Sequence, residues 1–327
     1  PLRTFAAVEG ALALVTLLIA FVLGLDISES VYAVQRLALA AQIPLRAVYA
    51  VGALVLLLPP TMLMGATMPL ASEAFQRQLH AADSRLVPVL FFVNTLGAAA
   101  GALATSLRLL PLLGQQQTLL VAIAANTTAA MLLFAASTQV ANASPGAEAP
   151  PTPFRVGLDD GLGFALGFIA LAYEMLLFRV LVLAHEPLPT TFAVGLCLFL
   201  LAWSIGMAMA PLLPHVPSLA GITVVLVGAV PLVYAIDLSS GFNLTGGALY
   251  YALPAVGFGM LYGVIVARVA KDWGRDVGRY AAFNTLGSCA GVLGATLVGL
   301  ELPLSAATSA LACLMVAVAT ADLAARE

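Results

Sequence analysis

The sequence predicts an all-α polytopic membrane protein with about ten transmembrane helices arranged in two repeats. Hydrophobic residues make up 62% of the 327 residues and charged residues only 9%, whereas a soluble domain has about 25% charged residues. The mean hydropathy is +1.04. The pattern NTLGAAAG, which begins at Asn94, returns as NTLGSCAG from Asn284, an offset of 284 − 94 = 190 residues. A pattern of this length at equivalent places indicates two copies of one unit.

The repeated pattern predicts how the helices that carry it are packed. Each copy places an asparagine inside an apolar helix and follows it with two glycines four residues apart. Glycines at this spacing share one helix face and let another backbone approach closely. An amide in hydrocarbon needs a hydrogen-bond partner. We therefore expect Asn94 and Asn284 each to point into the helix bundle at a packing seam.

Composition excludes several classes of function. The net charge of −3 comes without a basic stripe, so the sequence gives no support for nucleic-acid binding. The cysteines have none of the spacings that indicate a disulfide relay, zinc or c-type haem, and the histidines fall in expected loops without common spacing. We predict no cofactor and no metal site. These residues are Cys197, Cys289, Cys313, His80, His185 and His215.

The first repeat is assigned to residues 1–137. Its four expected spans are 5 to 24, 45 to 70, 87 to 109 and 118 to 137, each long enough to cross a bilayer. Glu9 lies in the first span, near enough to its end to reach the interface. The stretch 25 to 44 is expected to be an interfacial helix or an ordered loop. Pro59 and Pro60 predict a kink or local unwinding in the second span.

The second repeat is assigned to residues 161–327, after a cytoplasmic linker at 138–160 that is rich in Pro and Ala. Its six expected spans are 161 to 183, 190 to 211, 217 to 236, 247 to 269, 279 to 300 and 303 to 323. Trp203 is expected to serve packing. The first repeat lacks counterparts of the first two of these spans, so we expect two further spans before Pro1 in the natural protein. The outline is a major-facilitator-type bundle without the first two helices of repeat one.

The positive-inside rule sets the expected orientation. One side receives nine basic residues and the other three, which places both termini and the linker in the cytoplasm. The nine are Arg3, Arg77, Arg85, Arg155, Arg268, Lys271, Arg275, Arg279 and Arg326, and the three are Arg36, Arg46 and Arg108. Arg279 is counted in this scheme with a charged cytoplasmic loop that begins at Arg268.

Three segments resemble a known family. The segment LLPPTMLMGATMPL, starting at Leu57, the NTLGA that starts at Asn94, and Tyr173-Glu174 with Arg179 are similar to the membrane part of fused transporter/spermidine-synthase-like proteins of bacteria. This resemblance implies a transporter-like fold in the bacterial inner membrane and a soluble synthase-like partner or domain. No GxGxxG-type segment or acidic substrate pocket of an aminopropyltransferase is present in the sequence. Synthase activity is therefore not expected of this chain.

Glu174 is the sharpest candidate for a binding residue. A carboxylate inside a span costs about 2.5 to 3.5 kcal/mol on insertion scales and usually serves a pathway or a pair. Arg179 lies five residues further along, about 140° around a helix, so the two side chains can pair only by bending. The structural alternative is an ion pair or a protonated, hydrogen-bonded acid. The substrate-binding set we expect is Glu174, Asn94, Asn284, Tyr173 and Arg179, although asparagines at such places also serve helix packing.

The sequence is compatible with two functions. The first is a transporter-like membrane domain that binds or moves a small, cationic, polyamine-like metabolite between the repeats. The second is a non-catalytic membrane scaffold, whose partners are other membrane subunits. A water-accessible cavity at Glu174 would favour the transporter, whereas a Glu174 sealed against Arg or Asn would favour the scaffold. An intramembrane enzyme is not expected, since no nucleophile-base pair or HExxH motif occurs.

Overall fold

The computed structural model describes an all-α chain, in which no described residue lies in a strand. The described residues are 2–25, 28–79, 86–140, 156–184, 189–209, 255–257, 259–260, 262, 266, 275–297 and 302–324. Five helical stretches among them are long and apolar enough to cross a membrane: Leu2–Gly24, Ala47–Ala74, Pro88–Thr138, Leu158–Arg179 and Thr190–Met209. The all-α class and the character of a multi-pass membrane protein are thus confirmed.

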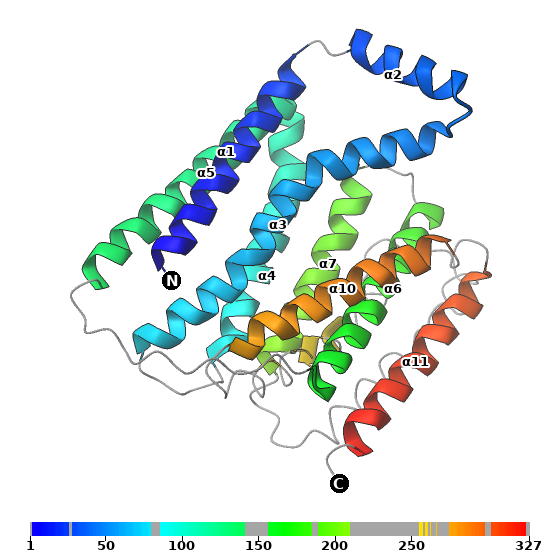
Figure 1. The fold of residues 1–327 in the computed structure, drawn as a ribbon. Helices are drawn as coiled ribbons and strands as arrows, with labels where there is room; N and C mark the ends of the chain where they lie inside the picture. Colours follow the sequence, from blue (N-terminus) through cyan, green and yellow to red (C-terminus); the bar gives the residue numbers. More distant parts are fainter. Residues whose placement is uncertain are drawn as a thin grey trace. The chain divides into compact units, whose positions relative to one another are not determined.

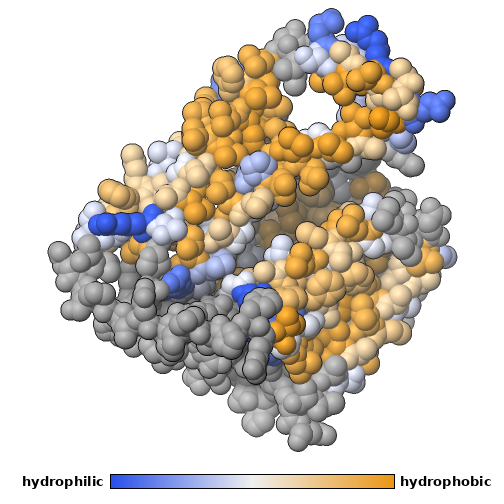
Figure 2. Space-filling view, viewed as in Figure 1, coloured by the Kyte–Doolittle hydropathy of each residue, from blue (hydrophilic) through white to orange (hydrophobic). Residues whose placement is uncertain are grey.

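The outer surfaces of the helices are strongly apolar. Figure 2 shows hydrophobic residues over most of the coloured surface. Large apolar side chains such as Phe21, Val55 and Leu112 are 65%, 68% and 74% exposed. Apolar surface on this scale exceeds what a monomer exposes to water. It fits a chain whose helices face lipid.

The chain divides into two compact units. Unit 1 consists of Pro1–His80 and Arg108–Ala147, and unit 2 of Ala81–Leu107 and Glu148–Glu327. The boundary between the two units at Leu107 and Arg108 therefore falls inside the continuous helical stretch 86–140. As a result, the helix that carries Asn94 belongs to unit 2, together with the helix that carries Asn284.

Unit 1 is built around α1 (Leu2–Gly24), which packs against α5 (Leu110–Val140) and α3 (Leu45–Leu79), as Figure 1 shows. Along the chain, α2 (Ser28–Ala40) connects α1 to α3. The stretch 25 to 44 is thus largely helical rather than a loop. Its apolar side chains Val34 and Leu37 are 51% and 71% exposed. This exposure is compatible with the interfacial position, which stays a prediction.

The prolines of α3 do not unwind it. The helix is continuous from Leu45 to Leu79 with Pro59, Pro60 and Pro69 inside it, and Figure 1 shows its axis changing direction along its length. A proline removes one backbone donor but its fixed φ is helical. The Thr61 hydroxyl donates to two carbonyls of the preceding turn, at 2.8 and 2.9 Å. Of the two expected outcomes, the structure has a bent helix without local unwinding.

The third and fourth expected spans are joined without a long loop. The helix α4 (Leu86–Ala104) passes into a π-helical turn at Thr105–Leu109, and α5 begins at Leu110. Inside α5, Gly114 has φ 74° and ψ 178°. Only glycine adopts this conformation readily, so Gly114 breaks the helix where the sequence predicts the connection between spans.

Unit 2 is centred on α6 (Leu158–Ala184), which packs against α10 (Arg275–Leu297), α11 (Leu304–Ala324) and α7 (Pro189–Met209). The helix α4 packs against α7. The largest fully buried side chains are Leu166, Ile169, Met207, Met260 and Tyr280. The span predicted at 217 to 236 lies outside the described residues, as does most of the one at 247 to 269.

Candidate functional site

Among the described helices of unit 2, α6 and α10 meet in a close glycine seam. Asn284 Nδ2 donates a hydrogen bond of 3.0 Å to the carbonyl of Gly163. A β-carbon on Gly167 would overlap the carbonyl oxygen of Asn284, and one on Gly287 would overlap that of Phe164. The backbones can approach this closely only because both helices carry glycine there. The seam predicted for the second copy of the repeated pattern is therefore confirmed.

The first copy of the pattern does not form such a seam within the described structure. Asn94 is exposed, and a β-carbon on Gly97 or Gly101 would meet no atom within 4 Å. The expectation that both asparagines point toward a partner is thus met by Asn284 and not by Asn94. The helix α4 packs against α7, and its buried side chains include Phe91 and Ala99 but not Asn94.

Glu174 and Tyr173 lie next to each other in the buried part of α6. Their exposed fractions are 7% and 3%. In the part of the chain that the structure describes, no hydrogen bond or ion pair reaches the Glu174 carboxyl. A buried carboxyl without a partner costs free energy, unless it is protonated or binds a cation.

Arg179 does not neutralise Glu174. Its Nη1 donates a hydrogen bond of 3.2 Å to the carbonyl of Leu302, in the segment just before α11. The intrahelical pair that required bent side chains is not formed. Arg179 therefore connects α6 to the start of α11.

The five expected binding residues do not converge on one place. Asn284 contacts α6 at Gly163, which is 174 − 163 = 11 residues before Glu174, or about 16 Å along the helix axis. Asn94 lies on the exposed face of α4. Of the five residues, only the neighbours Tyr173 and Glu174 are both buried. Of the predicted set, Glu174 is therefore the residue whose burial calls for an explanation, and its binding role stays a prediction.

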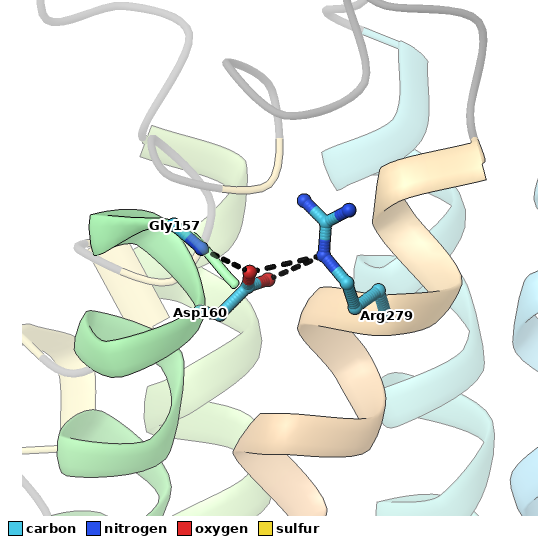
Figure 3. Close-up of polar contacts among 3 residues, drawn as sticks. All are labelled: Gly157, Asp160 and Arg279. Atoms are coloured by element: carbon cyan, nitrogen blue, oxygen red, sulfur yellow. Dashed lines mark hydrogen bonds and ion pairs between the residues drawn. The ribbon is translucent and has the colours of Figure 1, made fainter. Parts of the chain in front are cut away.

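An ion pair that was not predicted from the sequence lies at the start of α6. Arg279 Nε lies 3.0 Å from both carboxylate oxygens of Asp160, and Oδ2 also accepts a hydrogen bond of 2.8 Å from the Gly157 backbone N–H (Figure 3). The Asp160 side chain is 2% exposed and that of Arg279 24%. The assignment of Arg279 to a loop was wrong, since it lies inside α10.

One sequence signal points to this pair. Asp159 and Asp160 stand immediately before an apolar run, where acidic residues favour a helix N-terminus. Nothing in the sequence identifies Arg279 as the partner, because it lies 119 residues away.

A second close contact joins α7 to the helical residues near 255–260. A β-carbon on Gly206 would overlap the carbonyl oxygen of Val256, and one on Gly259 that of Trp203. The Tyr262 ring lies 5.5 Å from that of Trp203, 5.4 Å from Phe91 on α4 and 5.5 Å from Tyr280 on α10. The packing role predicted for Trp203 is confirmed. Glycine here serves helix contact, which explains its presence in an apolar span.

No protein-family model, curated protein or solved structure matches this chain. The resemblance to transporter/spermidine-synthase-like proteins therefore stays a prediction from the three segments that carry it. His80, His185 and His215 lie outside the described residues, so the absence of a metal site also stays a prediction.

We predict different effects for the two asparagines. Asn284→Ala removes the hydrogen bond to Gly163 and should lower the free energy of unfolding by about 1 kcal/mol, the usual size of a polar contact between membrane helices. Asn94→Ala is the matched control and should change it little, because Asn94 is exposed. Titration with SDS in mixed micelles, followed by circular dichroism, measures both. If both variants lost the same free energy of unfolding, the assignment of the seam to the second copy alone would be contradicted.

Proposed function

We propose that this chain is a transporter-like membrane domain that binds a small cation at the Glu174 carboxyl of α6. The observation that carries the proposal is a buried carboxyl to which no described group donates or pairs. A charge in this position is stable only with a counter-charge, and a positively charged ligand supplies one. Arg179 and Asn284 bind backbone carbonyls elsewhere.

The burial of Glu174 is compatible with transport only if α6 can part from a neighbour. Its exposed fraction of 7% leaves little of the side chain accessible to a ligand in this conformation. The contact of α6 with α10 is a close glycine seam, whereas its contacts with α7 and α11 are sparser. We infer that α6 and α10 move as a pair and that access opens toward α7 or α11, as one bundle of a transporter rocks against another.

Two further features support a two-repeat transporter. The contact between α4 and α7 joins a helix of the first predicted repeat to one of the second. The resemblance to bacterial transporter/spermidine-synthase-like proteins suggests a polyamine as the cation. The bacterial inner membrane and cytoplasmic termini belong to the same proposal.

Binding of spermidine to the chain in lipid nanodiscs tests the proposal. Calorimetry should detect binding to the unaltered chain and none to Glu174→Gln, because the amide keeps the size but removes the charge. Glu9→Gln is the matched control, since Glu9 is a half-exposed carboxyl in another apolar helix, and it should bind like the unaltered chain. Equal binding by the unaltered chain and Glu174→Gln would refute the role of Glu174, and no binding by either would refute the polyamine.

A membrane scaffold is the second candidate. The exposed residues Asn94, Gly97 and Gly101 of α4 favour it, since they would fit a chain that is completed by other subunits. Purification in mild detergent followed by mass spectrometry decides between the two. Stoichiometric companion subunits together with no spermidine binding would establish the scaffold in place of the transporter.

A further inference from the structure

Helix α6 carries two buried carboxyls in different surroundings. The Asp160 side chain is 2% exposed, and Glu174 is 7% exposed. Arg279 Nε lies 3.0 Å from both Asp160 oxygens, and the Gly157 N–H donates to one of them at 2.8 Å. Asp160 thus shows what keeps a buried carboxylate charged in this protein, namely a cation and a backbone donor. Among the described residues, Glu174 has neither.

The helices that pack against α6 bring no positive charge to Glu174. These helices are α7, α10 and α11. Neither α7 nor α11 contains Lys, Arg or His, and the single charged residue on them is an acid, Asp322. The basic residues of α10, Arg275 and Arg279, stand at its start. Arg279 meets α6 at Asp160, which is 174 − 160 = 14 residues before Glu174, or about 21 Å along the helix axis.

The remaining titratable groups do not supply a counter-charge either. On α6 itself, Arg179 donates to the carbonyl of Leu302. Residues 210–254, outside the described part of the chain, contain no Lys or Arg, and their single basic side chain is His215. The other titratable side chains on these four helices are neutral near pH 7 or, like Asp159 and Asp276, acidic. The neutral ones are Tyr173, Tyr280, Cys197, Cys289 and Cys313.

We propose that Glu174 holds a proton when no cation is bound, and that one ammonium group of the cation displaces this proton. The step is balanced, because the carboxyl releases one proton to solvent and the carboxylate that remains pairs with the ammonium group. The buried position is then neutral overall in both states, first as an acid and then as an ion pair, so neither state leaves an isolated charge in hydrocarbon.

This exchange rests on the proposed function and adds its coupling. A site that holds either a proton or a cation, but not both, moves the two in opposite directions when it faces the two sides of the membrane in turn. A proton gradient would then drive the cation. The class of transport that follows is proton/cation antiport, with Glu174 as the shared site.

Infrared spectroscopy of the full chain in phosphatidylcholine nanodiscs tests the protonated state without a ligand. The unaltered chain should show the carbonyl stretch of a protonated carboxyl, which shifts in heavy water, and Glu174→Gln should lose this component. Asp160→Asn is the matched control, because Asp160 is a buried carboxyl on the same helix but has a counter-charge. That variant should keep the component in full. Circular dichroism checks that both variants are folded.

Adding spermidine to the same samples tests the exchange. In weak buffer, a pH-sensitive dye should report one proton released for each spermidine bound, with the bound amount measured by calorimetry. The protonated-carboxyl band should decrease as binding proceeds. While that band is present, the apparent Kd should fall about tenfold for each unit by which the pH is raised, because the cation competes with one proton.

The possible failures are distinguishable. If Glu174→Gln and the unaltered chain show the same band, Glu174 is ionised and the proposal is overturned, whether or not spermidine binds. If spermidine binds through Glu174 without proton release, the exchange is overturned and the cation site stands. If Glu174→Gln loses the band but spermidine neither binds nor changes it, the exchange and the polyamine site are both overturned.

Discussion

Replacing Gly167 by alanine is expected to lower the free energy of unfolding by about 3 kcal/mol, the upper part of the usual range for overpacking. The added β-carbon would overlap the backbone carbonyl of Asn284. A backbone atom in a helix cannot turn aside as a side chain can, so α10 must move away from α6. This movement also strains the hydrogen bond from Asn284 to Gly163. SDS titration of the purified chain, followed by circular dichroism, measures the loss.

Gly161→Ala is the matched control for this prediction. Gly161 lies in the same helix, but a β-carbon there meets nothing within 4 Å. Alanine has a higher helix propensity than glycine by about 1 kcal/mol, so this variant should be unchanged or slightly more stable. If Gly167→Ala behaves like Gly161→Ala, α6 and α10 do not touch at Gly167.

Removing Arg279 is expected to have an effect of similar size. Arg279→Met leaves the Asp160 carboxylate, 2% exposed, without its counter-charge, and breaking a buried pair from one side typically costs about 3 kcal/mol or more. Asp160→Asn should cost less, because Arg279 is 24% exposed and can reach water, and because asparagine can still accept from the Gly157 N–H. The same unfolding titration measures both variants.

The double variant Asp160→Asn, Arg279→Met separates the pair from other effects. If the two groups interact directly, the double variant should lose clearly less stability than the two single losses added together. Arg36→Met, on the exposed surface of α2, serves as the control for removal of an arginine and should change stability by less than about 0.5 kcal/mol. Strictly additive losses would show that Asp160 and Arg279 do not depend on each other.

The repeated pattern shows what a local sequence can predict about helix packing and what it cannot. Asn94 and Asn284 stand in nearly the same eight residues, and both were expected to meet a partner. Only Asn284 does so among the described residues. The pattern determines what a helix face can bind, namely a close backbone with a free carbonyl. Whether a partner is present depends on which helices the rest of the chain places beside it.

The candidate site was predictable in part. Glu174 could be singled out because a carboxylate in an apolar span is costly, and its burial agrees with that reasoning. Its isolation from Arg179 and Asn284 could not be foreseen, since it depends on the segment before α11 and on the register between α6 and α10. The pair of Asp160 and Arg279 was missed for the same reason.

Composition and periodicity by themselves determined the class of this protein and the position of most of its described helices, because the length and polarity of each span are local properties set by the bilayer. The tertiary structure alone decided which helices pack together, which glycines form seams, and which charges meet. These features depend on contacts between residues such as Asp160 and Arg279, 119 positions apart, whose distance no local pattern encodes.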